Sequence, residues 1–152
     1  MNYKTEQEDF WAEKFGNDYV DRNKDFVSNI PFFTKLLKTT SNISSVVEFG
    51  CNIGLNLKLL KLLLPECKLT GVEINKKACQ DLKNWGGANV INDSIFNYDE
   101  NFQYDMSMVK GVLIHINPNM LHDVYEKLYT SSKRYILIAE YYNPTPVSIK
   151  YR

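Results

Sequence analysis

Residues 46–56 read VVEFGCNIGLN and join two patterns within one short stretch. The apolar run at 46–49 is typical of a buried strand, and the spaced leucines from Leu55 onward predict a helix. Gly50 and Gly54 lie between them, where backbone N–H groups and a helix N-terminus would face a ligand. A strand, a glycine turn and a helix in this order predict one unit of an open parallel sheet.

The same alternation continues along the chain. Strands are predicted at 45–49, 68–74, 89–92, 105–112 and 134–141, with helices at 55–64, 76–85 and 118–129 between them. This order predicts an α/β fold, a doubly wound and mostly parallel sheet that binds ligands beyond the carboxyl ends of its strands. We expect one domain over 1–152.

Two helices are predicted before the sheet begins. The first follows a capping box at Thr5 and Glu8 and breaks at Gly16 and Asn17, and the second covers 30–38. We expect residues 1–40 to form a helical lid or cover over the sheet.

Composition excludes several classes of function. Lys and Arg total 18, as do Asp and Glu, and no block of like charge stands out, which argues against a nucleic-acid partner. Three cysteines without a CxxC pair and only two histidines predict no metal site. The apolar runs are too short to span a bilayer and the first residues are polar, so we expect a cytoplasmic protein without a membrane partner.

The glycine turn does not fit a dinucleotide. The fingerprint G-x-G-x-x-G, started at Gly50, has Asn52 and Leu55 at its next two positions, so an NAD-dependent enzyme is the weaker reading. The spacing instead resembles the E-x-G-x-G-x-G turn of class I S-adenosylmethionine-dependent methyltransferases, which Glu48, Gly50 and Gly54 match. Asn52 replaces the middle glycine, and asparagine tolerates left-handed backbone angles. The resemblance implies S-adenosyl-L-methionine as cofactor and S-adenosyl-L-homocysteine as product.

Further cofactor contacts are expected where the second and third strands end. Glu73 lies at about the spacing expected for a ribose-binding acid, against the alternative of a solvated glutamate. Asp93 and Ser94 either bind the adenine amino group or form an ordinary turn, while Ile74 and Ile95 either flank the adenine or belong to the core. The predicted cofactor residues are Glu48, Gly50, Cys51, Asn52, Gly54, Glu73, Ile74, Asp93, Ser94, Ile95 and Lys110.

A closer resemblance extends over nearly the whole chain. Six segments together resemble the methylases associated with pseudaminic acid biosynthesis: TEQEDFWAEKFGNDYVDRN at 5–23, VVEFGCNIGLNLKLLK at 46–61, GVEIN at 71–75, KGVLIHINP at 110–118, VYEKLY at 124–129 and YILIAEYYNPTPVSIKYR at 135–152. The resemblance implies methyl transfer to a hydroxyl or amine of a sugar-derived small molecule, in a nonulosonic acid or surface-glycan pathway.

Candidate catalytic residues follow the last two strands. His115 can act as a base because imidazole titrates near neutral pH, although a core histidine is an equal alternative. Glu140 is a second base or a buried partner of a polar group. Tyr141, Tyr142 and Asn143 can hold the hydroxyls and C–H face of a sugar.

The N-terminal segment supplies weaker candidates. Trp11, Tyr19 and Arg22 are predicted to face the substrate from the lid, while Phe10 and Phe15 are expected to pack on the sheet. His122 is expected to be structural.

The predicted sheet has five strands, whereas class I methyltransferases have seven. We expect an exposed sheet edge that could permit dimerisation. Loss of the last strands motivates one alternative function, a cofactor-binding protein with impaired catalysis.

Overall fold

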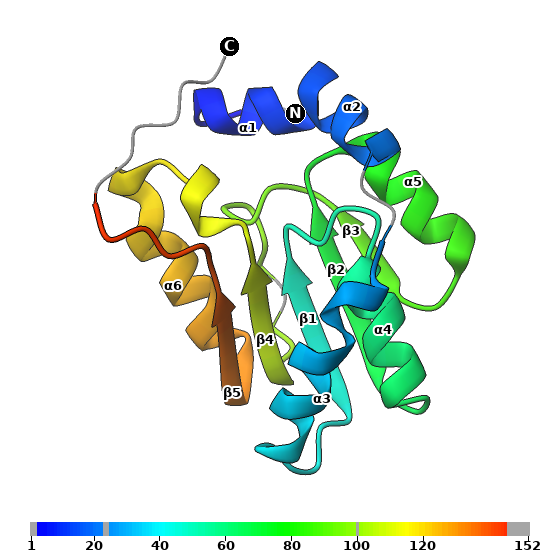
Figure 1. The fold of residues 1–152 in the computed structure, drawn as a ribbon. Helices are drawn as coiled ribbons and strands as arrows, with labels where there is room; N and C mark the ends of the chain where they lie inside the picture. The colour runs from blue at the N-terminus through cyan, green and yellow to red at the C-terminus, as the bar shows by residue number, and fades with distance from the viewer. Residues whose placement is uncertain (1–2, 23–24, 100, 146–152) are drawn as a thin grey trace.

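A computed structural model of the chain describes residues 3–22, 25–99 and 101–145 (Figure 1). Five parallel strands form one sheet in the order β3-β2-β1-β4-β5. The strands are β1 (Ser45–Phe49), β2 (Lys68–Glu73), β3 (Asn89–Asn92), β4 (Tyr104–Lys110) and β5 (Ser132–Ala139). The predicted doubly wound α/β fold is confirmed. The strand order reverses between β1 and β4, which is where such sheets open a ligand crevice.

Within the described residues, six α-helices and three short 3₁₀ helices connect and cover the strands. The α-helices are α1 (Glu6–Ala12), α2 (Lys14–Arg22), α3 (Ile30–Lys38), α4 (Leu55–Leu63), α5 (Lys76–Trp85) and α6 (Leu121–Thr130). The 3₁₀ helices are η1 (Val27–Asn29), η2 (Leu113–His115) and η3 (Pro118–Met120). Most predicted bounds agree closely with these. The strand predicted at 105–112 ends earlier, because Gly111 turns the chain with φ +68°.

Each face of the sheet has its own hydrophobic core, because side chains alternate along a strand. Val46 of β1 packs with α3, α4 and α5 through a cluster that includes Phe33, Leu57 and Leu82. Val47 and Phe49 point to the opposite face, which α6 covers. Among the described residues β5 pairs only with β4, so it is an edge strand, and its Ile136 and Ile138 are exposed.

The N-terminal helices differ from the prediction in two ways. The predicted break at Gly16 and Asn17 is wrong, because α1 ends at Ala12 and Gly16 lies inside α2. A β-carbon on Gly16 would lie 1.8 Å from the backbone oxygen of Trp11, so glycine permits close packing of the two helices rather than a break. Only α1 and α2 lie across the carboxyl ends of the strands (Figure 1). α3 packs on a face of the sheet through the fully buried Phe33.

Candidate functional site

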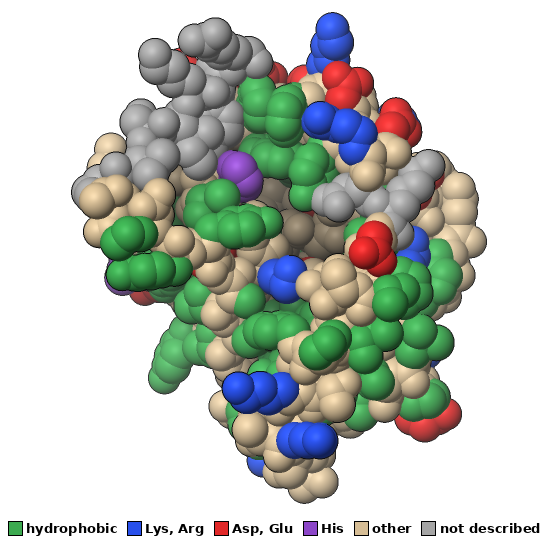
Figure 2. Space-filling model, in the orientation of Figure 1, with side chains coloured by type: hydrophobic (Ala, Val, Ile, Leu, Met, Phe, Trp, Pro, Cys, Tyr) green, Lys and Arg blue, Asp and Glu red, His purple; other side chains and the backbone are tan. Residues whose placement is uncertain are grey.

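A cavity of about 1040 Å³ opens at the carboxyl ends of the strands. Its walls come from α1, α2, the α3 region, the ends of β1 to β5 and η2. Figure 2 shows this hollow between apolar side chains, with a histidine at its edge. The volume is at the upper end of the range for small-molecule sites, so a nucleoside and a second small molecule can fit together.

The turn after β1 forms the floor of the cavity. Gly50 and Asn52 both adopt left-handed backbone angles, with φ of +69° and +50°. A β-carbon on Gly50 would lie 2.7 Å from a methyl group of Val112, so the turn needs glycine there. Gly54 also has a positive φ, but it does not line the cavity. Its missing side chain instead allows α4 to begin close to Leu82 of α5.

Glu73 ties the first turn to the second. Its carboxylate accepts hydrogen bonds from the backbone N–H of Asn52 at 2.7 Å and of Asn75 at 2.8 Å. Burial raises the pKa of the Glu73 carboxyl, and the two N–H bonds act in the opposite direction. Each carboxylate oxygen can accept a further bond, so Glu73 lines the cavity with acceptor capacity to spare.

Glu48 is a buried carboxylic acid beneath the turn and is 1% exposed. Its Oε1 accepts a bond of 2.6 Å from the Asn56 amide, which in turn accepts one from Asn29 at 3.2 Å. Its Oε2 is buried and has no hydrogen-bond partner among the described residues. Burial raises the pKa of Glu48 to about 8, against the opposing charge of Lys110.

The loop after β3 forms one end of the cavity. Asp93, Ser94 and Ile95 all line it, together with Ile74 from the end of β2. Asp93 Oδ1 accepts bonds from the Ser94 N–H at 2.7 Å and from the Asn97 amide at 2.9 Å. Asp93 can therefore both form the turn and bind a ligand, because these two bonds do not use its second carboxylate oxygen.

Glu140 organises the loop that carries His115. Its Oε1 accepts bonds from the backbone N–H groups of Val112 at 2.9 Å and Leu113 at 3.0 Å, at the start of η2. Its Oε2 is buried without a partner among the described residues. Burial lowers the pKa of His115 below its usual value, while the charge of Glu140 acts in the opposite direction. Of its two predicted roles, Glu140 therefore has the geometry of a buried partner.

An aromatic wall, consisting of Phe10, Trp11, Phe15 and Tyr19, faces the cavity from α1 and α2. The Trp11 ring lies at its centre, 5.1 Å from Phe15, 5.3 Å from Tyr19 and 4.6 Å from His115 between ring centroids. Phe10 and Phe15 stack on each other at 4.2 Å. The expectation that these two phenylalanines pack on the sheet is wrong.

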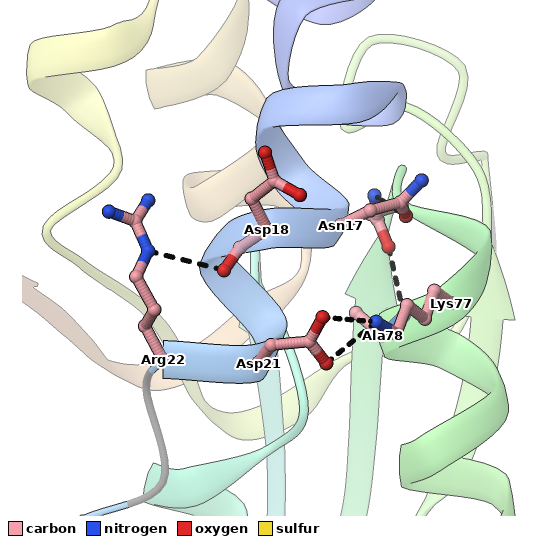
Figure 3. Close-up of polar contacts among 7 residues, drawn as sticks. Asn17, Asp18, Asp21, Arg22, Lys77 and Ala78 are labelled. Carbon is pink, nitrogen blue, oxygen red and sulfur yellow. Dashed lines mark hydrogen bonds and ion pairs between the residues drawn. The ribbon is translucent and has the colours of Figure 1, made fainter.

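Asn75 fastens the aromatic wall to the sheet. Its side-chain oxygen caps α5 through the Ala78 N–H, and its amide donates to the carbonyls of Trp11 and Ala12 and to Asn17 Oδ1. Figure 3 shows α2 beside α5 here, with Lys77 bridging both oxygens of Asp21 at 2.7 Å.

The structure brings together most but not all of the predicted site residues. Lining the cavity are Glu48, Gly50, Cys51, Asn52, Glu73, Ile74, Asp93, Ser94, Ile95, Lys110, His115, Glu140, Tyr141, Trp11 and Tyr19. Tyr142 and Asn143 do not line it: Tyr142 is 89% exposed, and the Asn143 side chain accepts bonds from Thr145. Arg22 also lies outside the cavity and donates a hydrogen bond of 3.2 Å to the Asp18 carbonyl (Figure 3). Its guanidinium lies 5.8 Å from the centroid of the Phe15 ring. His122 is on the surface of α6, beside Glu126.

Several cavity residues were missed by the sequence reasoning. They include Gln7, Glu8, Phe10, Phe15, Asp25, Ser28, Asn29, Phe32, Asn56, Asn75, Val112 and Ile138. Most come from segments far from the glycine turn in sequence. The unusual density of aromatic residues between Phe10 and Tyr19 was the available signal for the wall.

Solved methyltransferase structures share this fold. The sugar N-methyltransferase KedS8 from Streptoalloteichus sp ATCC 53650 matches with a TM-score of 0.71 and 16% identity. The match covers 88% of this chain and 56% of the KedS8 chain. The chain has the fold of the class I methyltransferases. The plantazolicin methyltransferase BpumL, solved with a substrate analogue and SAH, matches over 81% of this chain and 50% of its own, with a TM-score of 0.67 and 23% identity.

A third structure covers more of both chains. Magnesium protoporphyrin IX methyltransferase from Synechocystis PCC 6803, solved with bound SAM, matches over 91% of this chain and 77% of its own, with a TM-score of 0.65 and 12% identity. The chain thus spans about half the length of the first two structures and three quarters of the third. A scan of protein-family models and a search of curated proteins gave no match.

The described part of the chain contains neither a candidate membrane-spanning helix nor a candidate metal-binding cluster. No helix among them has the length and apolar character needed to cross a membrane. No group of three or more His, Cys, Asp or Glu in the described part of the chain is placed to hold a metal ion.

Proposed function

We propose that the chain is an S-adenosylmethionine-dependent methyltransferase acting on a hydroxyl or amine of a sugar-derived small molecule. The observation that carries the proposal is the carboxylate of Glu73, held by the N–H groups of Asn52 and Asn75 at the edge of the cavity. This arrangement holds a carboxylate beside a left-handed turn that lacks the dinucleotide spacing, which supports a role for Glu73 in binding the ribose.

The cavity residues fit the cofactor in three places. Glu73 would accept bonds from the ribose hydroxyls, and Ile74 and Ile95 would flank the adenine. The turn at Gly50 and Asn52 lines the cavity and would face the methionine part, and glycine is needed at position 50 because a β-carbon there would lie 2.7 Å from a Val112 methyl group. When bound, the cofactor supplies an electrophilic methyl group on a sulfonium.

The protein's own contribution is to orient the acceptor, exclude water and accept a proton. His115 lies at the cavity beside the Trp11 ring, on the η2 turn that Glu140 holds. Its lowered pKa means that the imidazole is neutral at neutral pH, the form that can take a proton from the acceptor. Glu140 acts as a positioning residue for that loop.

The finer assignment to a pseudaminic acid or surface-glycan pathway is supported by the six resembling segments, from 5–23 to 135–152. One similar structure is a sugar N-methyltransferase, which supports a sugar acceptor. The exposed edge of β5, with Ile136 and Ile138, supports pairing with a second copy.

The proposal is tested by incubating the protein with labelled cofactor and a panel of nonulosonic acid precursors. We expect a methylated product by mass spectrometry, and lower turnover with unchanged SAH affinity for His115→Ala. An unaltered rate in that variant would remove His115 as the base.

A second candidate is a cofactor-binding protein without catalysis, favoured by the positions of Tyr142 and Asn143, two predicted substrate residues that do not line the cavity. SAH binding without methylation of any acceptor would leave this candidate alone.

A further inference from the structure

We propose that the part of the cavity next to His115 binds a hydroxylated amine in its protonated form, the chemistry of an amino sugar, and excludes carboxylate-bearing acceptors. This inference rests on the proposed function, because it names the acceptor of the same site. It decides between hydroxyl and amine acceptors, which the fold leaves open.

The charges that line the cavity are the first step of the argument. The described lining residues include one lysine, Lys110, against five acids besides Glu48, whose pKa of about 8 keeps it protonated at neutral pH: Glu8, Asp25, Glu73, Asp93 and Glu140. A cleft lined by one sign of charge concentrates ligands of the opposite sign. The cofactor occupies the ends of β1, β2 and β3 in the proposed function, so Glu8, Asp25 and Glu140 lie outside the predicted cofactor contacts.

These three carboxylates are not paired with cations in the described structure. Glu8 accepts from the backbone N–H groups of Lys4 and Thr5, and Asp25 from that of Val27 at 2.8 Å. Glu140 accepts from two backbone N–H groups at the start of η2. The ion pairs found among the described residues involve none of the three. Backbone donors are neutral dipoles, so the net negative charge remains.

Unpartnered buried atoms indicate where a ligand would bind. Glu140 lines the cavity with a buried Oε2 that lacks a partner among the described residues. Glu48 Oε2 is in the same state, but it lies beneath the cofactor turn on a carboxyl that burial keeps protonated at neutral pH. A buried acceptor without a donor costs free energy, which an ammonium group with three N–H donors would offset.

The third such atom is a donor, the indole Nε1 of Trp11. An indole N–H can only donate, so its complement is an oxygen acceptor such as a ligand hydroxyl. Because the Trp11 ring contacts the His115 ring, this donor belongs to the wall beside the candidate base. A small molecule that carries both an amine and a hydroxyl would supply a donor for the buried carboxylate oxygen and an acceptor for the indole N–H.

The aromatic wall adds the same preference. Faces of Trp, Tyr and Phe attract cations and also cover the C–H groups of a sugar ring. An acceptor carboxylate would instead meet these negative ring faces and the acids. Its only lysine partner among the described lining residues, Lys110, already interacts electrostatically with Glu48.

The experiment compares three monosaccharides on one ring scaffold: glucosamine, glucose and glucuronic acid. Trp11 fluorescence reports binding in a Trp85→Phe background, because the chain has only two tryptophans and Trp85 does not line the cavity. The full chain is first saturated with SAH, whose binding is measured separately by calorimetry.

We expect glucosamine to bind at least about tenfold more tightly than glucose, which is about 1.4 kcal/mol, with no saturable binding of glucuronic acid. The preference for glucosamine should weaken as NaCl is raised. Glu140→Gln and Asp25→Asn should each reduce the preference for glucosamine, because each removes a negative charge. Asn at position 25 can still accept the hydrogen bond from the Val27 N–H, so the local turn is kept. Glu126→Gln, on the exposed surface of α6, is the matched control and should leave the preference unchanged.

Equal affinities, tighter binding of glucuronic acid, or binding of none of the three sugars would overturn the inference. Failure of SAH to bind defeats the proposed function before any sugar is added. SAH binding without a charge preference defeats only the amine inference, so the two failures are distinguishable.

Discussion

The two halves of the cavity are built in different ways. On the cofactor side, one hydrogen-bonded unit joins the ends of β1 and β2: Glu73 holds the N–H groups of Asn52 and Asn75. On the acceptor side, the aromatic wall is held by ring contacts and by one amide, that of Asn75. The first half is part of the sheet, and the second is a cover placed on it. Substitutions can therefore separate them.

The largest expected effect is on the cover. Gly16→Ala places a β-carbon against the Trp11 carbonyl, so we expect α1 and α2 to separate at a cost of roughly 3 kcal/mol or more of local stability. Hydrogen exchange of residues 6–22 measures it. Gly86→Ala is the control: its φ of +76° strains the backbone of the new alanine, but the β-carbon meets nothing within 4 Å, so the protection of residues 6–22 should not change. Unchanged protection in Gly16→Ala would show that the two helices do not pack as described.

The next effect concerns Glu48 and pH. Its folded pKa of about 8 exceeds the ordinary 4.5, so the folded state holds a proton that the unfolded state has lost. Stability is then full below pH 4.5 and falls as pH rises toward 8, by at most about 1.4 kcal/mol per pH unit from this group. Glu48→Gln should remove this fall. Urea unfolding across the window measures it, and equal slopes for both proteins would contradict the assignment.

Glu73→Ala tests the cofactor half directly. Loss of the carboxylate should weaken SAH binding by about 1.5–3 kcal/mol, because charge-assisted hydrogen bonds to the ribose are lost. Calorimetry at neutral pH measures the change. Asp123→Ala on α6, outside the cavity, is the comparison variant. An unaltered affinity in Glu73→Ala sinks the ribose assignment.

Asn75→Asp should give a smaller change in overall stability. Aspartate still caps α5, but it presents a carboxylate to the carbonyls of Trp11 and Ala12, so the cover loosens by about 1–2 kcal/mol. We expect SAH affinity to be largely kept while binding of the acceptor is lost. Lys77→Gln, which removes only the exposed pair with Asp21, should change stability by less than about 0.5 kcal/mol.

The cofactor and acceptor halves of the cavity also differ in how much of each the sequence predicts. The alternation of strands and helices, the turn at Gly50 and the position of Glu73 follow from local periodicity and spacing, and the structure places the turn and Glu73 at one cavity. Phe10 and Phe15 were misplaced because an aromatic stripe on a helix does not reveal which surface it meets. Tyr142 and Asn143 follow β5 by only a few residues, yet the chain turns them outward.

Asn75 has one contact that the sequence can predict and several that it cannot. Its capping role depends on the next three residues, so the sequence predicts it. Its contacts to Trp11, Ala12 and Asn17 join positions about sixty residues apart, which no local pattern encodes. The same holds for Glu140, whose partners at Val112 and Leu113 belong to another loop.

The most direct test of the central claim is a calorimetric titration of the full chain with SAH and, separately, with NADH. We predict saturable binding of SAH at one site and no binding of NADH, because Asn52 and Leu55 replace the glycines that a pyrophosphate needs. Binding of NADH with no affinity for SAH would contradict it.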